Sequence, residues 1–261
     1  MSNKLSIPVY LISLEQDCAR RKALEKRFPK YYSDFIHIKA IDGRKLTAKE
    51  YYEATIEFFH KHKRPMTPAE LGCSLSHIQA LESFLKTDES FALIIEDDVI
   101  GLDSDLELIV ESLTFFSSNS IVFVGCQEGL MNRYKYGFPL NNSLLKVPKY
   151  NYGNFSRAAA YMVSRKVAEV VLSYHKKNYI TVADFWFDLL KGSNVNTYYI
   201  NRLAHPLDLQ DSNLEVERSK FKRGFFKKAL SYKVVMSRIS QEVKFFYYKL
   251  KGYKNIGRFC E

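Results

Sequence analysis

The feature that most constrains the fold is the stretch FALIIEDDVIG, residues 91–101. Five apolar residues run directly into three carboxylates, Glu96, Asp97 and Asp98. A continuous apolar run of this length is typical of a strand buried on both faces, as in a parallel sheet covered by helices. Three negative charges at the end of such a strand therefore need a specific explanation.

Apolar runs alternate along the chain with stretches of helical character. The segment TPAELGCSLSH carries the strongest helix-start signal, because Thr67, Pro68 and Glu70 form a capping box with proline at the first helical position. This alternation predicts an α/β fold with a mostly parallel central sheet, in which ligands bind beyond the carboxyl ends of the strands. The predicted strands are residues 7–14, 34–41, 91–95, 120–125, a short strand after Arg157, and 196–200, while 126–156 is predicted to form long loops.

Charge divides the chain into two parts. Residues 1–217 hold 26 Lys/Arg and 27 Asp/Glu, a net charge of −1, whereas residues 218–261 hold 13 and 2, a net charge of +11. We therefore predict a neutral domain over 1–217 and a basic amphipathic helical tail over 218–261. Such a tail is typical of helices that lie on anionic membranes. It could also bind nucleic acid, but the neutral body and the acidic strand end weigh against that partner.

Neither a membrane span nor a secretory leader is expected. No window approaches the roughly 18–20 uninterrupted apolar residues of a membrane span, and the first residues lack a cleavage pattern. The four cysteines are scattered without zinc-type spacing, which favours reduced thiols. We therefore expect a cytoplasmic protein, held at the inner face of the membrane by its tail.

The clustered acids at the strand end favour a bound cation. Three carboxylates repel one another, and a crevice in an α/β fold does not solvate them fully. A hard divalent ion such as Mn²⁺ or Mg²⁺ takes oxygen ligands and completes its coordination with water and phosphate. The alternative is a solvated cluster near the start of the next helix.

Five short motifs occur in order: SLEQDCARR, AIDG, ELGCSLSH, LIIEDDV and AAAYMVSR. Together they resemble bacterial glycosyltransferase family 25, the lipopolysaccharide sugar transferases related to animal collagen galactosyltransferases, over roughly residues 7–215. The resemblance implies a GT-A type, Rossmann-like fold that binds a nucleotide-sugar through a metal at a DxD-type motif. Here the motif is Glu96-Asp97-Asp98, which departs from a strict DxD because its first residue is glutamate.

The resemblance also implies metal and donor contacts. Asp98 is the expected metal ligand, Glu96 is a further candidate ligand, and His205 could be the third. Glu96 and Asp97 could instead reach the ribose or the water shell of the metal. The remaining donor-binding candidates are Ser13, Arg20, Arg21, Asp42, Ser76 and His77. For several of these the simpler alternatives stay open, namely an exposed helix face for the arginines, a turn aspartate and a buried, hydrogen-bonded histidine.

Family members invert the anomeric centre, which requires a general base for the acceptor hydroxyl. Asp184 and Asp188 are the candidates, four residues apart on a predicted helical face, and Asp184 matches the family position. The resemblance predicts β-linked transfer of galactose from UDP-galactose to a lipid-linked oligosaccharide of lipopolysaccharide or lipooligosaccharide. UDP-glucose is the alternative donor, and a nucleic-acid-binding protein acting through its tail is the alternative from another class.

Overall fold

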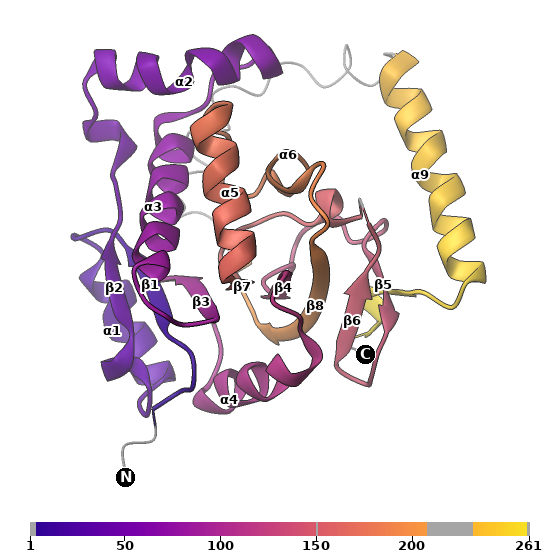
Figure 1. Cartoon of the computed structure of the whole chain (residues 1–261), viewed down its shortest axis with the longest axis horizontal. Helices are drawn as coiled ribbons and strands as arrows, with labels where there is room; N and C mark the ends of the chain where they lie inside the picture. Colours follow the sequence, from indigo (N-terminus) through magenta and orange to yellow (C-terminus); the bar gives the residue numbers. More distant parts are fainter. Residues whose placement is uncertain (1–3, 150, 208–231, 260–261) are drawn as a thin grey trace.

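The computed structural model describes residues 4–149, 151–207 and 232–259, and the account below concerns these residues (Figure 1). The predicted domain boundary between residues 217 and 218 lies outside them, as does Cys260.

Across the described residues, nine strands form one sheet in the order β2-β1-β3-β7-β4-β8-β6-β5-β9. β1 pairs with β2 and β3 in parallel, and β4 pairs with β8 in parallel. The strands are β1 (Val9–Ser13), β2 (Ile36–Lys39), β3 (Phe91–Glu96), β4 (Ser120–Gly125), β5 (Tyr136–Pro139), β6 (Leu144–Val147), β7 (Ala160–Ser164), β8 (Asn196–Leu203) and β9 (Lys254–Asn255).

The prediction of a mostly parallel sheet is wrong, because the sheet is mixed. β7 lies between β3 and β4 and is antiparallel to both. The hairpin of β5 and β6 continues the sheet beyond β8 with antiparallel pairs, as does β9. Five strands, β1, β2, β3, β4 and β8, nevertheless share one direction, so their carboxyl ends lie along one edge of the sheet.

Helices cover both faces of the central strands. One face carries α3 (Pro68–Leu85), α5 (Arg165–Lys177) and α6 (Trp186–Leu190), with α3 and α5 side by side in Figure 1. The other face carries α1 (Cys18–Arg27) and α4 (Asp103–Glu111). α2 (Ala48–His62) packs with α3 around a smaller apolar cluster that includes Phe58 and Met66.

The two-sided burial follows from the alternation of side chains along a strand. In β1, Tyr10 and Ile12 join the core under α3 and α5, whereas Leu11 joins the core under α1 and α4. In β3, Ile94 and Ile95 divide in the same way. A strand with two buried faces needs apolar residues at successive positions, which explains the continuous apolar runs in the sequence.

Two local predictions have clear outcomes. The capping box at Thr67 and Glu70 is confirmed, with Pro68 in the first helical turn. The region predicted as long loops, 126–156, instead contains the β5–β6 hairpin.

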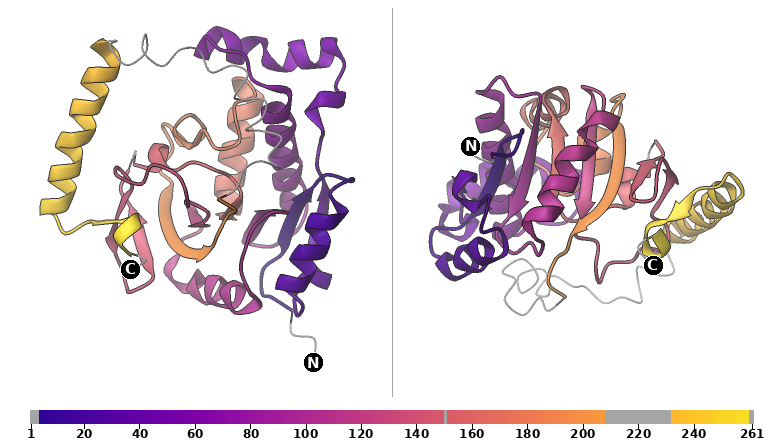
Figure 2. Two further views of the ribbon diagram at one scale, coloured as in Figure 1. Left: turned by 180° about the vertical axis from the view of Figure 1, so that it is seen from behind. Right: turned by 90° about the horizontal axis from the view of Figure 1, so that it is seen from below.

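α9 (Tyr232–Leu250) lies within the predicted basic tail and stands at the far end of the sheet, beside β5 (Figure 2). The rings of Phe245 and Tyr248 pack against Tyr136, with centroid separations of 6.3 and 4.8 Å. The chain then adds β9 to the sheet edge and ends its described part in α10 (Ile256–Phe259). Among the described helices, none has the length and apolarity to cross a membrane.

Candidate functional site

A pocket opens at the edge where the five codirectional strands end. Its wall comes from the carboxyl ends of β1, β2 and β3, the N-terminal part of α3, and the segment that follows β8. Eight of the predicted site residues line it: Ser13, Arg20, Asp42, Ser76, Glu96, Asp97, Asp98 and His205. The site therefore lies where ligands bind in open α/β sheets.

Arg20 and His205 hold two of the three clustered carboxylates. Asp97 is buried, accepts a hydrogen bond of 2.6 Å from the Ser13 hydroxyl and lies 3.2 Å from Arg20 Nη1. The same Arg20 nitrogen lies 3.6 Å from Asp98 Oδ2, and His205 Nε2 lies 3.3 Å from that oxygen. His205 and Asp98, the two residues named above as candidate metal ligands, thus lie side by side, and Arg20 supplies a positive charge to both aspartates.

Glu96 points toward a different partner. Its Oε1 lies 3.1 Å from His77 Nε2, and His77 Nδ1 lies 3.1 Å from the Tyr161 hydroxyl. His77 is buried and does not line the pocket. It matches the simpler alternative of a buried, hydrogen-bonded histidine, and it acts on the pocket through Glu96.

Burial and charge pairing give the two aspartates different acidities. Burial raises the pKa of Asp97 to about 6, although the Ser13 hydrogen bond and the Arg20 charge act in the opposite direction. Burial also disfavours ionised Asp98, but the hydrogen bond from His205 and the charges of His205 and Arg20 outweigh it and lower the pKa of Asp98. Burial alone would lower the pKa of His205, and the contact with Asp98 raises it instead.

Asp98 has the properties of a metal ligand. Its Oδ1 is buried and has no hydrogen-bond partner among the described residues. A buried, unpaired carboxylate oxygen is costly unless a further partner binds it. The Asp98 carboxylate is the oxygen ligand type that Mn²⁺ and Mg²⁺ prefer, and the imidazole of His205 is a common nitrogen ligand of divalent metals, so the residues present fit the predicted cation.

The pocket wall depends on a very close contact between two glycines. A Cβ on Gly72 would lie 2.4 Å from the Ile41 carbonyl oxygen and 2.5 Å from the Gly43 nitrogen, so α3 touches the AIDG segment backbone to backbone. At this contact the Ser76 hydroxyl accepts a hydrogen bond of 2.8 Å from Ile41 N and donates one to Gly72 O. Ser76 thus fastens two walls of the pocket together.

The other predicted donor contacts differ in position. Arg21 donates to the Ser13 hydroxyl and to the carbonyls of Leu14 and Glu15, so it braces the turn after β1 and does not line the pocket. Asp42 lines the pocket, and its carboxylate binds the Arg44 side chain at 2.7 Å.

The prediction that Asp184 and Asp188 share a helical face is wrong, because α6 begins only at Trp186. Asp184 lies in the preceding turn and accepts a 2.9 Å hydrogen bond from Arg157 N. Asp188 is on α6, with its Oδ2 3.3 Å from His62 Nε2, and neither aspartate lines the pocket.

Hydrogen bonds connect Asp184 to the metal side of the site. Arg157 donates from its side chain to the Glu128 carbonyl at 2.7 Å, and the Glu128 carboxylate accepts from His205 N at 3.2 Å. Asp184 therefore belongs to the network around His205, whereas Asp188 belongs to the cluster around α2.

Comparison with known sequences identifies the origin of this arrangement. The profile of "Glycosyltransferase family 25 (LPS biosynthesis protein)" matches residues 6–186, well over half of the chain. The chain belongs to glycosyltransferase family 25. The predicted family membership is confirmed, and glycosyltransferase is the enzyme class that this membership gives.

Curated relatives of this family 25 chain come from insects. A "Glycosyltransferase 25 family member" of Anopheles gambiae is 37% identical over 103 residues, which are 37% of this chain and 17% of that protein. The protein of the same name in Drosophila melanogaster is 30% identical over 103 residues, with the same shares of 37% and 17%. The match thus spans less than a fifth of the length of either relative.

Solved structures resemble the family 25 chain only distantly. A mannose-1-phosphate geranyltransferase from Thermus thermophilus has a TM-score of 0.43 at 8% identity, covering 79% of this chain and 75% of that one. The inositol-1-phosphate CTP transferase of T. maritima has a TM-score of 0.36 at 11% identity, covering 84% and 98%. The strand order and pairing of this chain, and not a likeness to these structures, define its fold.

Sequence reasoning missed several residues around the family 25 site. Arg44 and Cys73 line the pocket. Arg44 directly follows the AIDG motif and Cys73 lies within ELGCSLSH, and neither has a spacing to other residues that predicts a site. Arg157 and Cys126 have positive φ values of 63° and 60° and face each other where β7 begins and β4 ends. Such strained backbone clusters at functional sites, but no pattern in the sequence signals it.

Proposed function

We propose that this family 25 chain transfers a hexose from a UDP-sugar to a hydroxyl group of an acceptor sugar with inversion of configuration. The observation that carries the proposal is the pocket at the strand ends, where Asp98 and His205 meet beside Arg20. Carboxylate, imidazole and guanidinium groups together suit a metal-bound diphosphate, since the guanidinium pairs with phosphate oxygens through its planar donors.

Asp98 and His205 would hold the divalent cation, Mn²⁺ or Mg²⁺. When bound, this ion would neutralise the charge that develops on the departing diphosphate. Arg20 orients both aspartates and supplies a further positive charge on the same side. Asp42, at the opposite wall, stands where an acid accepts hydrogen bonds from ribose hydroxyls.

Asp184 is the general base of the proposal. It accepts the proton of the acceptor hydroxyl while the acceptor oxygen bonds to the anomeric carbon and the bond to UDP breaks. The Asp184 carboxylate accepts a hydrogen bond from Arg157 N, and this contact holds it next to the His205 network. Asp188 is the weaker candidate, because its carboxylate is occupied by His62.

The acceptor of the proposal is a lipid-linked oligosaccharide of lipopolysaccharide or lipooligosaccharide, in keeping with the description of the matching family. Galactose is the proposed donor sugar and glucose the alternative. Both sugars follow from the resemblance of the sequence motifs to the family.

α9 supports the proposal that the protein is located at the inner face of the cytoplasmic membrane. Its exposed apolar residues recur every three or four positions on one side: Met236, Ile239, Val243, Phe246 and Leu250. Phe245 and Tyr248 face the body instead, so the apolar stripe points away from it. Amphipathic helices of this kind bind the interface of anionic membranes.

The charges of α9 agree with an anionic surface. Glu242, the single acidic residue in the α9 sequence, is turned toward the body by a 2.8 Å ion pair with Arg133 and a 2.7 Å hydrogen bond from Tyr134. Lys244 and Lys249 are exposed and lie on the helix next to Tyr248 and Phe245, at the margins of the side that faces the body. The outer side of the helix is therefore apolar, with basic residues at its margins.

The deciding experiment is a nucleotide-sugar panel with the full chain. We expect Mn²⁺-dependent release of UDP and transfer to an oligosaccharide acceptor with UDP-galactose, compared directly with UDP-glucose. Asp98→Asn is the inactive control. Activity of Asp98→Asn equal to that of the wild type would contradict the proposal. A chain that responds to no UDP-sugar but binds DNA or RNA in a salt-sensitive way would also contradict it.

A further inference from the structure

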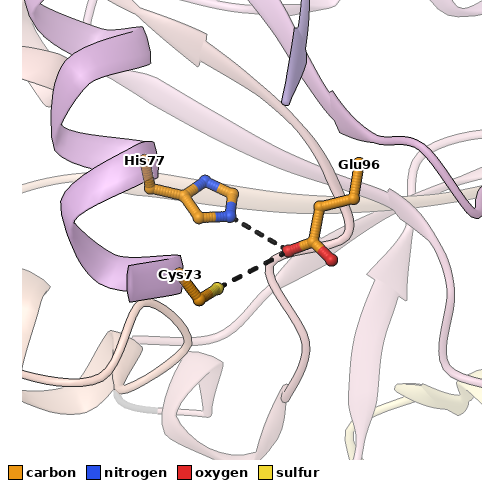
Figure 3. Close-up of side chains that lie close together, drawn as sticks. All are labelled: Cys73, His77 and Glu96. Carbon is orange, nitrogen blue, oxygen red and sulfur yellow. Dashed lines mark hydrogen bonds and ion pairs between the residues drawn. The ribbon is translucent and has the colours of Figure 1, made fainter. Parts of the chain in front are cut away.

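Three side chains of metal-ligand type meet in the wall of the pocket (Figure 3). Cys73 and His77 are one turn apart on α3, so they project from the same side of the helix, and Glu96 is the last residue of β3. Cys73 Sγ, His77 Nε2 and a Glu96 carboxylate oxygen all lie within 4.8 Å of one another. The figure shows the thiol and the imidazole converging on the same carboxylate oxygen.

The separations suit one small ion. Glu96 Oε1 lies 3.1 Å from His77 Nε2 and 3.8 Å from Cys73 Sγ. Tetrahedral coordination with typical zinc bond lengths places nitrogen, oxygen and sulfur ligands about 3.3–3.6 Å apart. Shifts of a few tenths of an ångström would therefore bring both distances to Glu96 into the coordination range. The thiol and the imidazole lie within 4.8 Å of each other, and rotation of these side chains can close the remaining gap.

The imidazole is already oriented as in a metal site. A metal-bound histidine typically hydrogen-bonds through its second ring nitrogen, which fixes the direction of the first. Here His77 Nδ1 lies 3.1 Å from the hydroxyl of the buried Tyr161, and the two rings stack with centroids 5.7 Å apart. Nε2 is consequently directed toward Glu96 and Cys73.

We propose that Cys73, His77 and Glu96 form a binding site for a thiophilic divalent cation of the zinc class, distinct from the Asp98–His205 site. A thiolate and an imidazole select Zn²⁺ over Mg²⁺ and Mn²⁺, which prefer oxygen ligands. Cys73 and Glu96 line the pocket, so the ion can enter from it and a water molecule can occupy the fourth position.

An ion at this site would change the donor pocket. It would bind the Glu96 carboxylate and add positive charge to the wall beside Asp97 and Asp98. On the proposed function, Zn²⁺ would therefore alter UDP binding even when Mn²⁺ is saturating. The existence of the site does not depend on that consequence.

Cobalt spectroscopy tests the site directly, because Co²⁺ bound to a thiolate gives a sulfur-to-metal charge-transfer absorption. The full chain with Co²⁺ should show this band, and added Zn²⁺ should remove it. Cys73→Ser should lack the band, whereas Cys18→Ser, which removes an exposed thiol, and His205→Ala should retain it. No band in the wild type, or a band that survives in Cys73→Ser, would overturn the proposal.

Two further variants guard against a folding defect. Glu96→Gln keeps the side-chain shape, and Tyr161→Phe keeps the ring stacking, so both should retain the band. Each should weaken Zn²⁺ binding by roughly 10-fold or more in competition titrations, as loss of a ligand or an orienting partner does elsewhere. Zn²⁺ affinity unchanged in both variants would count against the three-ligand site.

UDP titrations separate this proposal from the proposed function. With Mn²⁺ present, Zn²⁺ should shift the UDP affinity of the wild type several-fold. If the cobalt band appears as described but the chain binds no UDP under any condition, the proposed function fails and the metal site stands. If UDP binds normally and the cobalt band is absent, the proposed metal site fails and the proposed function stands.

Discussion

Asp98 Oδ2 lies 3.3 Å from His205 Nε2, which joins the end of β3 to the segment after β8. Two strands, β7 and β4, separate β3 from β8 in the sheet, so the contact spans the edge of the central strands. The unpaired Asp98 Oδ1 lies beside it. The pair therefore joins the part of the site at the ends of β1, β2 and β3 to the part contributed by the segment after β8.

Asp98→Asn should lower transfer at least about 100-fold, as loss of a group that stabilises developing charge typically does. The amide preserves the shape of the side chain, so we expect thermal unfolding within a few degrees of the wild type. Steady-state kinetics and calorimetry measure the two effects. Asp88→Asn, at an exposed aspartate just before β3, is the matched control and should behave as wild type.

Asp184→Asn should reduce kcat by roughly 100-fold to 10,000-fold, the usual contribution of a general base, while UDP affinity changes little. Asp188→Asn should retain most of the activity, because its contact is with His62 rather than with the network around His205. Kinetics combined with UDP titration separates the two residues. Equal loss of turnover and donor affinity in Asp184→Asn would indicate a structural role instead.

Gly72→Ala should destabilise the protein, although glycine to alanine in a helix normally stabilises by about 0.5–1 kcal/mol. The added Cβ would lie 2.4 Å from the Ile41 carbonyl oxygen, and the AIDG segment would have to move. We expect a loss of roughly 1–3 kcal/mol, as overpacking of a dense contact gives, together with weaker UDP binding. Gln79→Ala, exposed on the same helix, should leave both the unfolding free energy and UDP binding unchanged.

His175 should make the fold sensitive to mild acid. Burial lowers its pKa to about 4, and nearby His77 acts in the same direction. Between pH 6.5 and 4 the unfolded chain binds more protons at this residue than the folded chain, so stability rises with pH in that window. The full effect is up to about 3 kcal/mol.

His175→Gln tests this sign, because glutamine does not titrate. Chemical denaturation at several pH values should show a flatter dependence between pH 6.5 and 4 in the variant than in the wild type. His60→Gln, at an exposed position of α2, should leave the slope unchanged. An equally steep slope in His175→Gln would assign the acid sensitivity to other groups.

Replacing Val243 and Phe246 by glutamate should release the chain from anionic vesicles. Burying a side chain of this size contributes about 1.5–3 kcal/mol, so the partition coefficient should fall by more than roughly 10-fold per residue. Vesicle sedimentation measures it. Tyr52→Glu, at an exposed aromatic on α2, is the control for added charge. Transfer to a soluble acceptor should persist in the variant, and unchanged vesicle binding would refute the membrane role of α9.

The sequence was sufficient for much of the fold because the decisive signals were local. Two-sided burial produces continuous apolar runs, and the capping box at Thr67 and Glu70 requires only four neighbouring residues. The acidic end of β3 and its place at the pocket followed from the rule that ligands bind at strand ends. The motifs therefore predict both Asp98 and His205 as site residues, although no sequence pattern predicts the contact between them.

Local sequence signals do not predict the direction of a strand or the partners of a side chain. β7 is buried on both faces, and a buried strand has the same apolar pattern whether it runs parallel or antiparallel to its neighbours. The strands of the β5–β6 hairpin have four residues each, too few for a clear alternation. α6 begins only at Trp186, so Asp184 lies outside the helix. The contact between Cys73 and Glu96 depends on how α3 packs against the sheet.

The position of β7 sets an order of assembly during synthesis. β1, β2 and β3 can pair as soon as they leave the ribosome, but β4 has no neighbour on the β3 side until Ala160–Ser164 emerges. Until then the edges of β3 and β4 are open to pairing with other chains. The nascent chain thus passes through a stage in which most of the pocket lining exists without His205, and this interval is where chaperone protection would matter most.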